Sequence, residues 1–272
     1  MFTATLLANP VCANLDRVAV ESLRDAWGGG AAHWLNPGIA AEFALAEIPE
    51  NRWQVWQNLQ TLGLDLVVQP TTGRRKKMLL ADMDSTMIGQ ECIDELADMA
   101  GKGPKVAAIT ARAMNGELDF EAALIERVDL LRNLPTAVIA QVLKERITYA
   151  TGGRTLIATM KAHGAYAALV SGGFSDFTSA VAAHLGFDEQ RANTLLASCG
   201  KLTGEVARPI LGRDAKGLHR GQDFLDRLVE FFGSNIAGLL LQLFDLALDI
   251  NQIGHCITLK ISDRQRSHIL RC

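Results

Sequence analysis

The sequence has little cysteine, and its few cysteines are far apart. Cys12, Cys92, Cys199, Cys256 and Cys272 include no C-x-x-C pair. Structural zinc sites and disulfide frameworks need closely spaced or evenly paired cysteines, so this distribution argues against both. We interpret the thiols as reduced.

Long hydrophobic runs are also missing. Residues 1–10 lack the basic start and the extended apolar core of a secretory signal, and we interpret them as part of a strand. The most apolar later segment, residues 236–250, is interrupted by Gln242, Asp245 and Asp249 and is shorter than the ~20 residues of a membrane-spanning helix. We therefore expect a soluble, cytoplasmic protein without a membrane partner.

Neither sign of charge dominates. The chain of 272 residues carries 27 Lys and Arg against 30 Asp and Glu, a net charge of −3. Nucleic-acid binding depends on clustered positive charge, so this balance gives no reason to expect a nucleic-acid partner. Hydrophobic residues make up 49% and charged residues 21%, as in ordinary globular proteins. The length exceeds that of one average domain, so we expect two domains.

The pattern of residues 1–72 indicates a small α+β domain. Some segments have the composition of strands and others that of helices. The strands are expected at residues 3–8, 31–35, 40–47 and 64–69, and the helices at residues 16–27 and 50–62. This β-α-β-β-α-β order is that of a ferredoxin-like or ACT-like domain. By fold analogy alone, such a domain is a candidate for binding an amino-acid regulator or for joining two chains into an oligomer.

The second domain, residues 73–272, begins with an apolar run that ends in two acids. Residues 78–81 are predicted to form a buried strand, and Asp82, Asp84 and Ser85 follow it directly. Open α/β sheets bind ligands at the carboxyl ends of their strands. Two acids at i and i+2 point to the same side, so they can share a cation such as Mg²⁺ or divide nucleophilic and acid–base work.

Several helical segments separate this strand from the next. They are expected at residues 92–100, 104–115, 120–132 and 136–146. A crossover between parallel strands needs only one helix, so we interpret residues 90–148 as a helical cap over the strand ends. The next strand, residues 166–170, leads into Ser171 and Gly172, whose hydroxyl and amide suit a phosphoryl group. A turn between two later strands is expected at residues 201–204.

Several segments of this domain resemble the haloacid dehalogenase-like phosphatases and, among these, the phosphoserine phosphatase family. They are Asp-Met-Asp-Ser-Thr at 82–86, the run at 106–127, Leu-Val-Ser-Gly-Gly-Phe at 169–174 and Gly-Lys-Leu-Thr-Gly at 200–204. They occur in the family's order within residues 78–217. The resemblance implies an α/β fold with a Rossmann-like parallel sheet and a helical cap. It also implies Mg²⁺ dependence and hydrolysis of the small molecule L-phosphoserine as the last step of serine synthesis.

The resemblance further implies roles for single residues. Asp82 is the nucleophile that becomes an aspartyl-phosphate, and Asp84 is the general acid that then activates water. The metal is held by Asp82 and by the backbone carbonyl of Asp84. Ser171 and the amide of Gly172 hold the phosphoryl oxygens, and Lys216 offsets charge as the bond to Asp82 forms.

In the cap, the resemblance assigns the substrate amino group to Glu91 and the substrate carboxylate to Arg127. Met114 and Phe120 occupy cap positions that shield the site from water. Two simpler interpretations stay open. Glu91 is also explained as a first-turn residue that interacts with the helix dipole, and Arg127 as a surface residue paired with Glu126.

The resemblance stops after about residue 217. The family continues with a strand and Gly-Asp-Gly-x-Asn-Asp, whose acid completes the metal site, and the tail at residues 218–272 has no such sequence. Asp245 and Asp249 share a predicted helix face, but no glycine turn places them beside Asp82. A frameshift and a divergent tail both explain the change. We expect impaired phosphatase activity and an exposed edge of the parallel sheet.

Three functions therefore stay open. The first is a magnesium-dependent phosphoserine hydrolase. The second is a phosphotransferase of the same superfamily, which passes the phosphoryl group from Asp82 to another alcohol. The third is a catalytically silent or regulatory relative that binds serine through Glu91 and Arg127. Product analysis with an added alcohol separates the first two, and calorimetry with serine and magnesium identifies the third.

Overall fold

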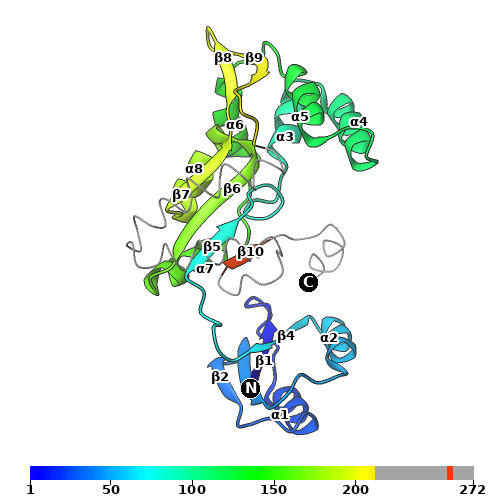
Figure 1. Ribbon diagram of the computed structural model, residues 1–272, viewed down its shortest axis with the longest axis vertical. Helices are drawn as coiled ribbons and strands as arrows, with labels where there is room; N and C mark the ends of the chain where they lie inside the picture. The colour runs from blue at the N-terminus through cyan, green and yellow to red at the C-terminus, as the bar shows by residue number, and fades with distance from the viewer. Residues whose placement is uncertain (212–255, 260–272) are drawn as a thin grey trace, which may run out of the picture. The chain divides into compact units, whose positions relative to one another are not determined.

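The chain forms two compact units, Met1–Arg75 and Lys76–Cys272 (Figure 1). The computed structural model describes residues 1–211 and the backbone of residues 256–259. None of the helices in these ranges is long and apolar enough to cross a lipid bilayer. The helices expected within residues 218–250 lie outside the described residues.

The first unit is an antiparallel sheet with two helices. In chain order its elements are β1 (Phe2–Ala8), α1 (Arg17–Ala26), β2 (His33–Asn36), β3 (Ala40–Leu45), α2 (Arg52–Gln60) and β4 (Leu64–Pro70). The strand order is β2-β3-β1-β4, and β1 runs antiparallel to both of its neighbours. The order of the elements and of the strands agrees with the ferredoxin-like arrangement expected from the sequence.

Alternation of side chains along the strands creates the core of this unit. Ala4 and Leu6 on β1 point to the same face, and both are fully buried. Their partners across the sheet are buried as well: Phe43 on β3 lies opposite Ala4, and Leu66 on β4 lies opposite Leu6. Val20 of α1 belongs to the same cluster, so the helix packs on this face.

The second unit is built on a parallel sheet. Its elements are β5 (Met78–Ala81), α3 (Cys92–Met99), α4 (Gly103–Met114), α5 (Phe120–Asp129), α6 (Ala137–Glu145), α7 (Gly153–Ala162), β6 (Tyr166–Phe174), α8 (Ser175–Leu185), β7 (Glu189–Asn193), β8 (Leu195–Ser198), β9 (Lys201–Val206) and β10 (Cys256–Leu259). The strand order is β10-β5-β6-β7, and every adjacent pair is parallel. The expected α/β, Rossmann-like sheet is therefore confirmed.

The sequence predicts that the tail leaves an edge of the parallel sheet exposed, and the end strand of the sheet beside β5 comes from that tail. β10 pairs in parallel with β5, with Ile257 opposite Leu79. Its sequence, Cys-Ile-Thr-Leu, is rich in residues with high strand propensity, but four residues are too few to be recognised by pattern alone. The tail thus supplies a strand at this edge without the glycine-rich sequence of the family.

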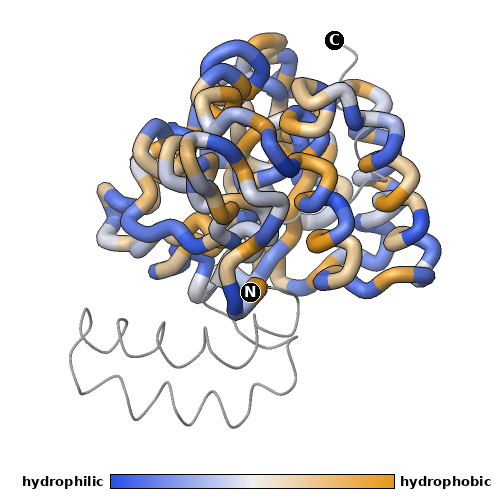
Figure 2. The backbone as a smooth tube through the Cα atoms, turned by 90° about the horizontal axis from the view of Figure 1, so that it is seen from above, coloured by the Kyte–Doolittle hydropathy of each residue, from blue (hydrophilic) through white to orange (hydrophobic). Residues whose placement is uncertain are grey.

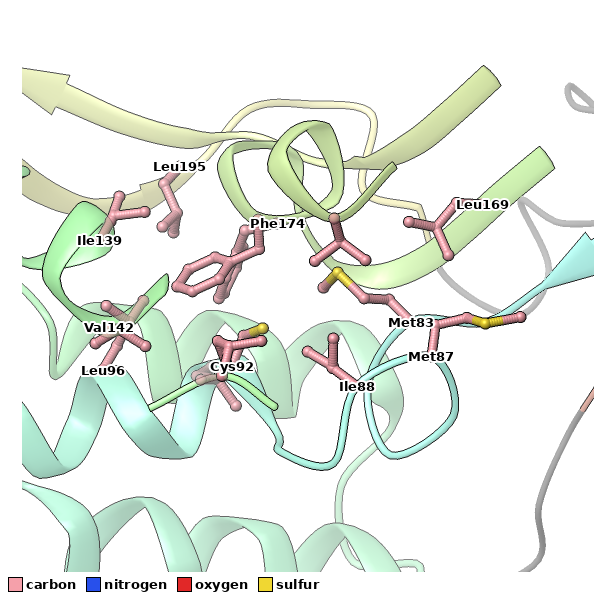
Figure 3. Packing of buried hydrophobic residues seen from close by; sticks show 14 of the residues in the cluster. Met83, Met87, Ile88, Cys92, Leu96, Ile139, Val142, Leu169, Phe174 and Leu195 are labelled. Atoms are coloured by element: carbon pink, nitrogen blue, oxygen red, sulfur yellow. The ribbon is translucent and has the colours of Figure 1, made fainter. Parts of the chain in front are cut away.

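A continuous apolar core joins the sheet to the cap. Phe174 at the end of β6 is fully buried and lies near Ile139 and Val142 of α6 and near Met83 (Figure 3). Hydrophobic and hydrophilic residues alternate in short stretches along the tube in Figure 2, as expected for elements with one buried face. The loop after β5 is therefore anchored in the core, which restricts the positions of its polar side chains.

The helices α3–α6 separate β5 from β6, as the cap interpretation requires. Helix α3 contacts α4 and α6, and α4 contacts α5. Figure 1 shows α3, α4 and α5 grouped beside the hairpin β8–β9. The hairpin bonds to the cap through its backbone, because the amide of Asn133 donates to the carbonyl of Leu202 and the amide of Thr136 donates to the carbonyl of Gly200, both at 2.9 Å.

The turn of this hairpin lies earlier than predicted. Cys199 and Gly200 form it with φ values of 51° and 75°, whereas residues 201–204 belong to β9. Consecutive left-handed residues match the twist of a two-residue hairpin. The residue pairs most typical of such a turn are Asn-Gly and Asp-Gly. Because this turn has cysteine in the first position, its sequence does not indicate a hairpin turn.

Candidate active site

The loop after β5 carries both predicted catalytic acids. The carbonyl of Met83 accepts hydrogen bonds from the amides of Met87 at 2.9 Å and Ile88 at 3.1 Å, which closes one helical turn. Ser85 adopts a left-handed backbone with φ of 56°, and its amide donates to the carbonyl of Gln90 at 3.1 Å. This tight loop holds the acids at the carboxyl end of β5.

Asp82 is half-buried, and a neighbouring amide orients its carboxylate. The amide of Met83 donates to Asp82 Oδ1 at 2.9 Å. The Met83 side chain is fully buried in the apolar core. The backbone that holds the Asp82 carboxylate is therefore fixed by core packing.

The carboxylate of Asp84 lies beside Cys92, the first residue of α3. The amide of Cys92 donates to Asp84 Oδ2 at 3.2 Å, and the thiol of Cys92 donates to Oδ1 at 3.3 Å. Burial raises the pKa of Asp84 to about 7, with further increases from the charges of Glu91 and Asp82, while the bonds from Cys92 oppose the shift. A carboxyl with this pKa exchanges protons readily near neutral pH.

The turn after β6 approaches Asp84 closely. Ser171 is 1% exposed, and its Oγ accepts a hydrogen bond from the amide of Gly173 at 2.9 Å. A Cβ atom at Gly173 would lie 3.3 Å from Asp84 Oδ2 and 3.1 Å from Ser171 Oγ. A side chain at Gly173 would therefore crowd both groups, so the loop after β6 and the Asp84 carboxyl lie close together.

The cap covers the same loop at one point. A Cβ atom at Gly172 would lie 3.0 Å from Cζ of Phe120, the first residue of α5. Phe120 thus contacts the predicted phosphoryl-binding loop, as its shielding role requires. Met114, at the end of α4, is 74% exposed, so its side chain is directed largely to solvent.

Glu91 occupies the N-cap position of α3, where the helix dipole favours a negative charge. It makes no side-chain capping bond to the helix. Instead its Oε1 accepts a short hydrogen bond from the hydroxyl of Ser85 in the acidic loop. The structure thus supports the dipole interpretation and also places the carboxylate beside the predicted site.

Arg127 lies on α5, and its Nε donates to the carbonyl of Ala123 at 3.2 Å. Burial lowers its pKa, and the charges of Asp94, Glu91 and Asp84 oppose this shift, so the guanidinium lies within electrostatic reach of all three acids. Glu126, the partner considered for Arg127 in the sequence, pairs instead with Arg112, whose Nη1 donates to it at 3.0 Å.

Only part of a metal site can be identified. In the stretches of chain with described positions, no group of three or more His, Cys, Asp or Glu residues is suited to a metal ion. The carboxylate of Asp82 and the carbonyl of Asp84 are hard oxygen donors, and Mg²⁺ often binds one or two carboxylates together with substrate phosphate and water. The mutual repulsion of Asp82, Asp84 and Glu91 also favours a cation, so these residues fit magnesium. Lys216 lies outside the described residues.

Two features of the site were missed in the sequence. Asn193 ends β7, is 2% exposed and donates through Nδ2 to the carbonyl of Gly172 at 2.8 Å. Its position at the carboxyl end of a third parallel strand was an available signal. The side chain of Gln90 bonds to Thr148, which joins the entry and exit of the cap. Nothing in the spacing of these two residues, far apart in the chain, indicates this contact.

Comparison with known sequences gives a consistent result. The family model described as haloacid dehalogenase-like hydrolase matches residues 79–233. A phosphoserine phosphatase of Archaeoglobus fulgidus is 41% identical over 169 residues, which are 61% of this chain and 49% of the relative. The matched part of the chain thus corresponds to about half the length of that relative.

Solved structures show similar architecture. A phospho-aspartyl intermediate analogue of phosphoserine phosphatase is 39% identical, covers 59% of this chain and 74% of its own, and superposes with a TM-score of 0.51. The unliganded probable phosphoserine phosphatase of Vibrio cholerae is 26% identical with a TM-score of 0.66. That alignment covers 97% of this chain and 74% of the other, so the similarity extends over both units.

Proposed function

The chain belongs to the haloacid dehalogenase-like hydrolases, and on this premise we propose that it hydrolyses L-phosphoserine to L-serine and phosphate. The observation that carries the proposal is the Asp84 carboxyl, whose pKa lies at about 7, close to Asp82 and within contact distance of the Ser171–Gly173 loop. In this proposal the nucleophile, the proton donor and the phosphoryl-binding groups come from the ends of the two adjacent strands β5 and β6. The similar proteins named phosphoserine phosphatase support the same conclusion.

The cap supports the choice of an amino-acid phosphate. L-Phosphoserine carries an ammonium and a carboxylate beside its phosphate. Glu91 and Arg127 offer the complementary charges. The charge of Glu91 raises the pKa of Asp84, and the charges of Glu91 and Asp84 both act on the pKa of Arg127. In this proposal Glu91 binds the ammonium and Arg127 pairs with the carboxylate, so that the phosphoester is directed toward Asp82.

In the first chemical step, a carboxylate oxygen of Asp82 attacks phosphorus and the bond to the serine oxygen breaks. The protonated carboxyl of Asp84 gives its proton to the leaving oxygen, which departs as the serine hydroxyl. Ser171 and the amide of Gly172 hold the phosphoryl oxygens. Lys216 is proposed to offset the negative charge that accumulates around Asp82.

The second step releases phosphate. The Asp84 carboxylate, now deprotonated, takes a proton from water, and the water oxygen attacks phosphorus. The bond to Asp82 breaks, so the free carboxylate is regenerated and inorganic phosphate leaves. A pKa of about 7 allows the same carboxyl to be an acid in the first step and a base in the second.

Magnesium would be held by the Asp82 carboxylate and the Asp84 backbone carbonyl, and when bound it supplies positive charge that offsets the repulsion between the phosphate and the nucleophile. The Asp82 carboxylate is prepared for this arrangement by the amide of Met83, which already occupies Oδ1. The acid that completes the metal site in the family is absent from the sequence after Gly217. We therefore propose a slow hydrolase.

The test is turnover of L-phosphoserine by the purified full chain in the presence of magnesium, followed as phosphate release. We expect measurable hydrolysis that the Asp82→Asn variant abolishes, because the amide oxygen cannot form the aspartyl-phosphate. No turnover by the unmodified chain, together with serine binding in calorimetry, would instead show a silent binding module. Phosphate transfer to an added alcohol in place of water would show a phosphotransferase.

Substrate identity is tested with phosphoethanolamine, which lacks the carboxylate. Arg127→Gln should lower kcat/KM for L-phosphoserine by about 10–100-fold, because the substrate carboxylate loses its ion pair with Arg127. Turnover of phosphoethanolamine, which forms no such pair, should change little. The matched control is Arg112→Gln, which removes an exposed cap arginine paired with Glu126. Equal losses on both substrates would contradict the role of Arg127.

A further inference from the structure

Asn193 lies outside the family motifs but contacts the centre of the proposed site. It is the last residue of β7, it is 2% exposed, and it lies opposite Phe174 in the pairing of β6 with β7. Both the nitrogen and the oxygen of its side-chain amide form hydrogen bonds. Nδ2 donates to the carbonyl of Gly172 at 2.8 Å, and Oδ1 accepts from the amide of Leu211 at 2.6 Å.

The orientation of this amide follows from its partners. The Leu211 amide can only donate and the Gly172 carbonyl can only accept, so Oδ1 must face the first and Nδ2 the second. Nδ2 also lies 3.4 Å from the carbonyl of Leu211. A buried side chain with this set of bonds connects the loop after β6 to the segment at Leu211.

The bond to Gly172 continues as a chain of hydrogen bonds. The carbonyl of Gly172 and the amide of Gly173 belong to one peptide group, which is therefore held at both ends. The amide of that peptide donates to Ser171 Oγ at 2.9 Å. Because Oγ accepts this bond, its own hydrogen is available for another acceptor, and bonds in such a chain polarise one another.

We propose that Asn193 is a positioning residue for phosphoryl binding. It fixes the Gly172–Gly173 peptide, which orients the Ser171 hydroxyl as a donor to a phosphoryl oxygen. At the same time it holds the backbone amide of Leu211. This inference rests on the proposed function, and Asn193 itself touches neither substrate nor reacting atoms.

The decisive variant is Asn193→Asp, which keeps the acceptor for Leu211 and the side-chain shape but loses the donor to Gly172 when ionised. Burial raises the pKa of an introduced carboxyl, so protonation at low pH restores a donor. We expect kcat/KM relative to the unmodified chain to fall by about 10–100-fold at about pH 8 and to recover by about fivefold or more at about pH 5. Inhibition by inorganic phosphate should weaken in parallel.

Two further variants separate positioning from packing. Asn193→Ala should lose activity by a similar factor without recovery at low pH. Asn58→Asp makes the same chemical change on an exposed part of α2 and should stay within about twofold of the unmodified chain. Thermal melts identify any variant that fails to fold. A deficit of Asn193→Asp that is the same at both pH values, or no deficit in a folded variant, would overturn the proposal.

Failure of the proposed function is distinguishable from failure of this inference. If the unmodified chain hydrolyses no phosphomonoester, the function is wrong, and calorimetry with inorganic phosphate then decides the role of Asn193. Weaker phosphate binding by Asn193→Asp at about pH 8 than at about pH 5 would support it. Phosphate binding unchanged in both Asn193 variants, or absent in the unmodified chain, would overturn it.

Discussion

Asp84 shows how a single carboxyl acquires its properties from its surroundings. Burial and the charges of Glu91 and Asp82 favour its protonated form, while the amide and thiol of Cys92 favour the ionised form. Since burial is the largest of these effects, the pKa of Asp84 ends at about 7. The same balance that suits acid–base chemistry imposes a stability cost when the group is ionised.

This cost predicts how Asp84→Asn responds to pH. The ordinary pKa of an aspartate carboxyl is 3.8 and that of Asp84 in the folded protein is about 7, so between these values the folded protein holds a proton that the unfolded chain has lost. Stability conferred by the protonated group is thus lost as pH rises through this window. Asparagine stays neutral, so the variant should become more stable than the unmodified chain, by roughly 2–4 kcal/mol above about pH 7.

The measurement is thermal unfolding in metal-free buffer from about pH 5 to about pH 8. The expected result is a difference in melting temperature that grows with pH and then levels off. Asp25→Asn, at an exposed position of α1, is the control and should show little change. A difference that is constant across this range would show that Asp84 has no raised pKa in the folded protein.

At the scale of elements, two chain segments connect the cap to the sheet. Ile88 pairs with Tyr149 in an antiparallel bridge, and the amide of Gly89 donates to the carbonyl of Thr148 at 2.9 Å. The side chain of Gln90 adds two bonds to Thr148, one to its amide and one to its hydroxyl, each 2.9 Å long. These contacts join residues 88–90 to residues 148–149, and we call them the ladder at the base of the cap.

Gln90→Ala should loosen this ladder. Loss of two hydrogen bonds is expected to lower the free energy of unfolding by about 1–2 kcal/mol. Amide hydrogen exchange should also accelerate at Gly89 and Ala150, where the backbone pairs across the ladder. The control is Gln141→Ala on α6, whose side chain bonds only to Glu145 among the described residues. Unchanged exchange at both amides would show that the backbone bonds alone secure the cap.

At the scale of the whole molecule, the unit Met1–Arg75 and the unit Lys76–Cys272 each have their own core. The similarity to the Vibrio cholerae structure covers nearly the whole chain, so this combination of units is shared with that protein. A role of the N-terminal unit in regulation or in oligomer formation stays a prediction from fold analogy. Its antiparallel sheet has edges at β2 and β4, where further pairing would occur.

The proposed metal requirement concerns the tail as well as the loop after β5. In this proposal Asp82 and Asp84 provide two oxygen donors, whereas the motif Gly-Asp-Gly-x-Asn-Asp is absent from the tail sequence. Half-maximal activity should therefore need about 10–100-fold more magnesium than in the Archaeoglobus relative assayed in parallel, because fewer anionic ligands hold the ion. Titration of magnesium against phosphate release measures this. An equal requirement in both proteins would mean that the tail does supply a ligand.

The sequence by itself determined most of the elements and indicated the main residues of the proposed site. Its apolar periodicities located the strands and helices, since each must bury one face, and local motifs identified Asp82, Asp84, Ser171 and Gly172. Such signals are contained in a few neighbouring residues. They also explain why β10 was missed, because a strand of four residues has no detectable period.

The tertiary structure alone decided which distant residues meet. Asn193 reaches Gly172, Gln90 reaches Thr148, and Cys92 reaches Asp84 only after parallel strands and cap helices have packed. The pKa of Asp84 likewise depends on burial, which is a property of the assembled core and of no local segment. Sequence patterns record which face of an element is buried, but packing between elements determines what that face touches.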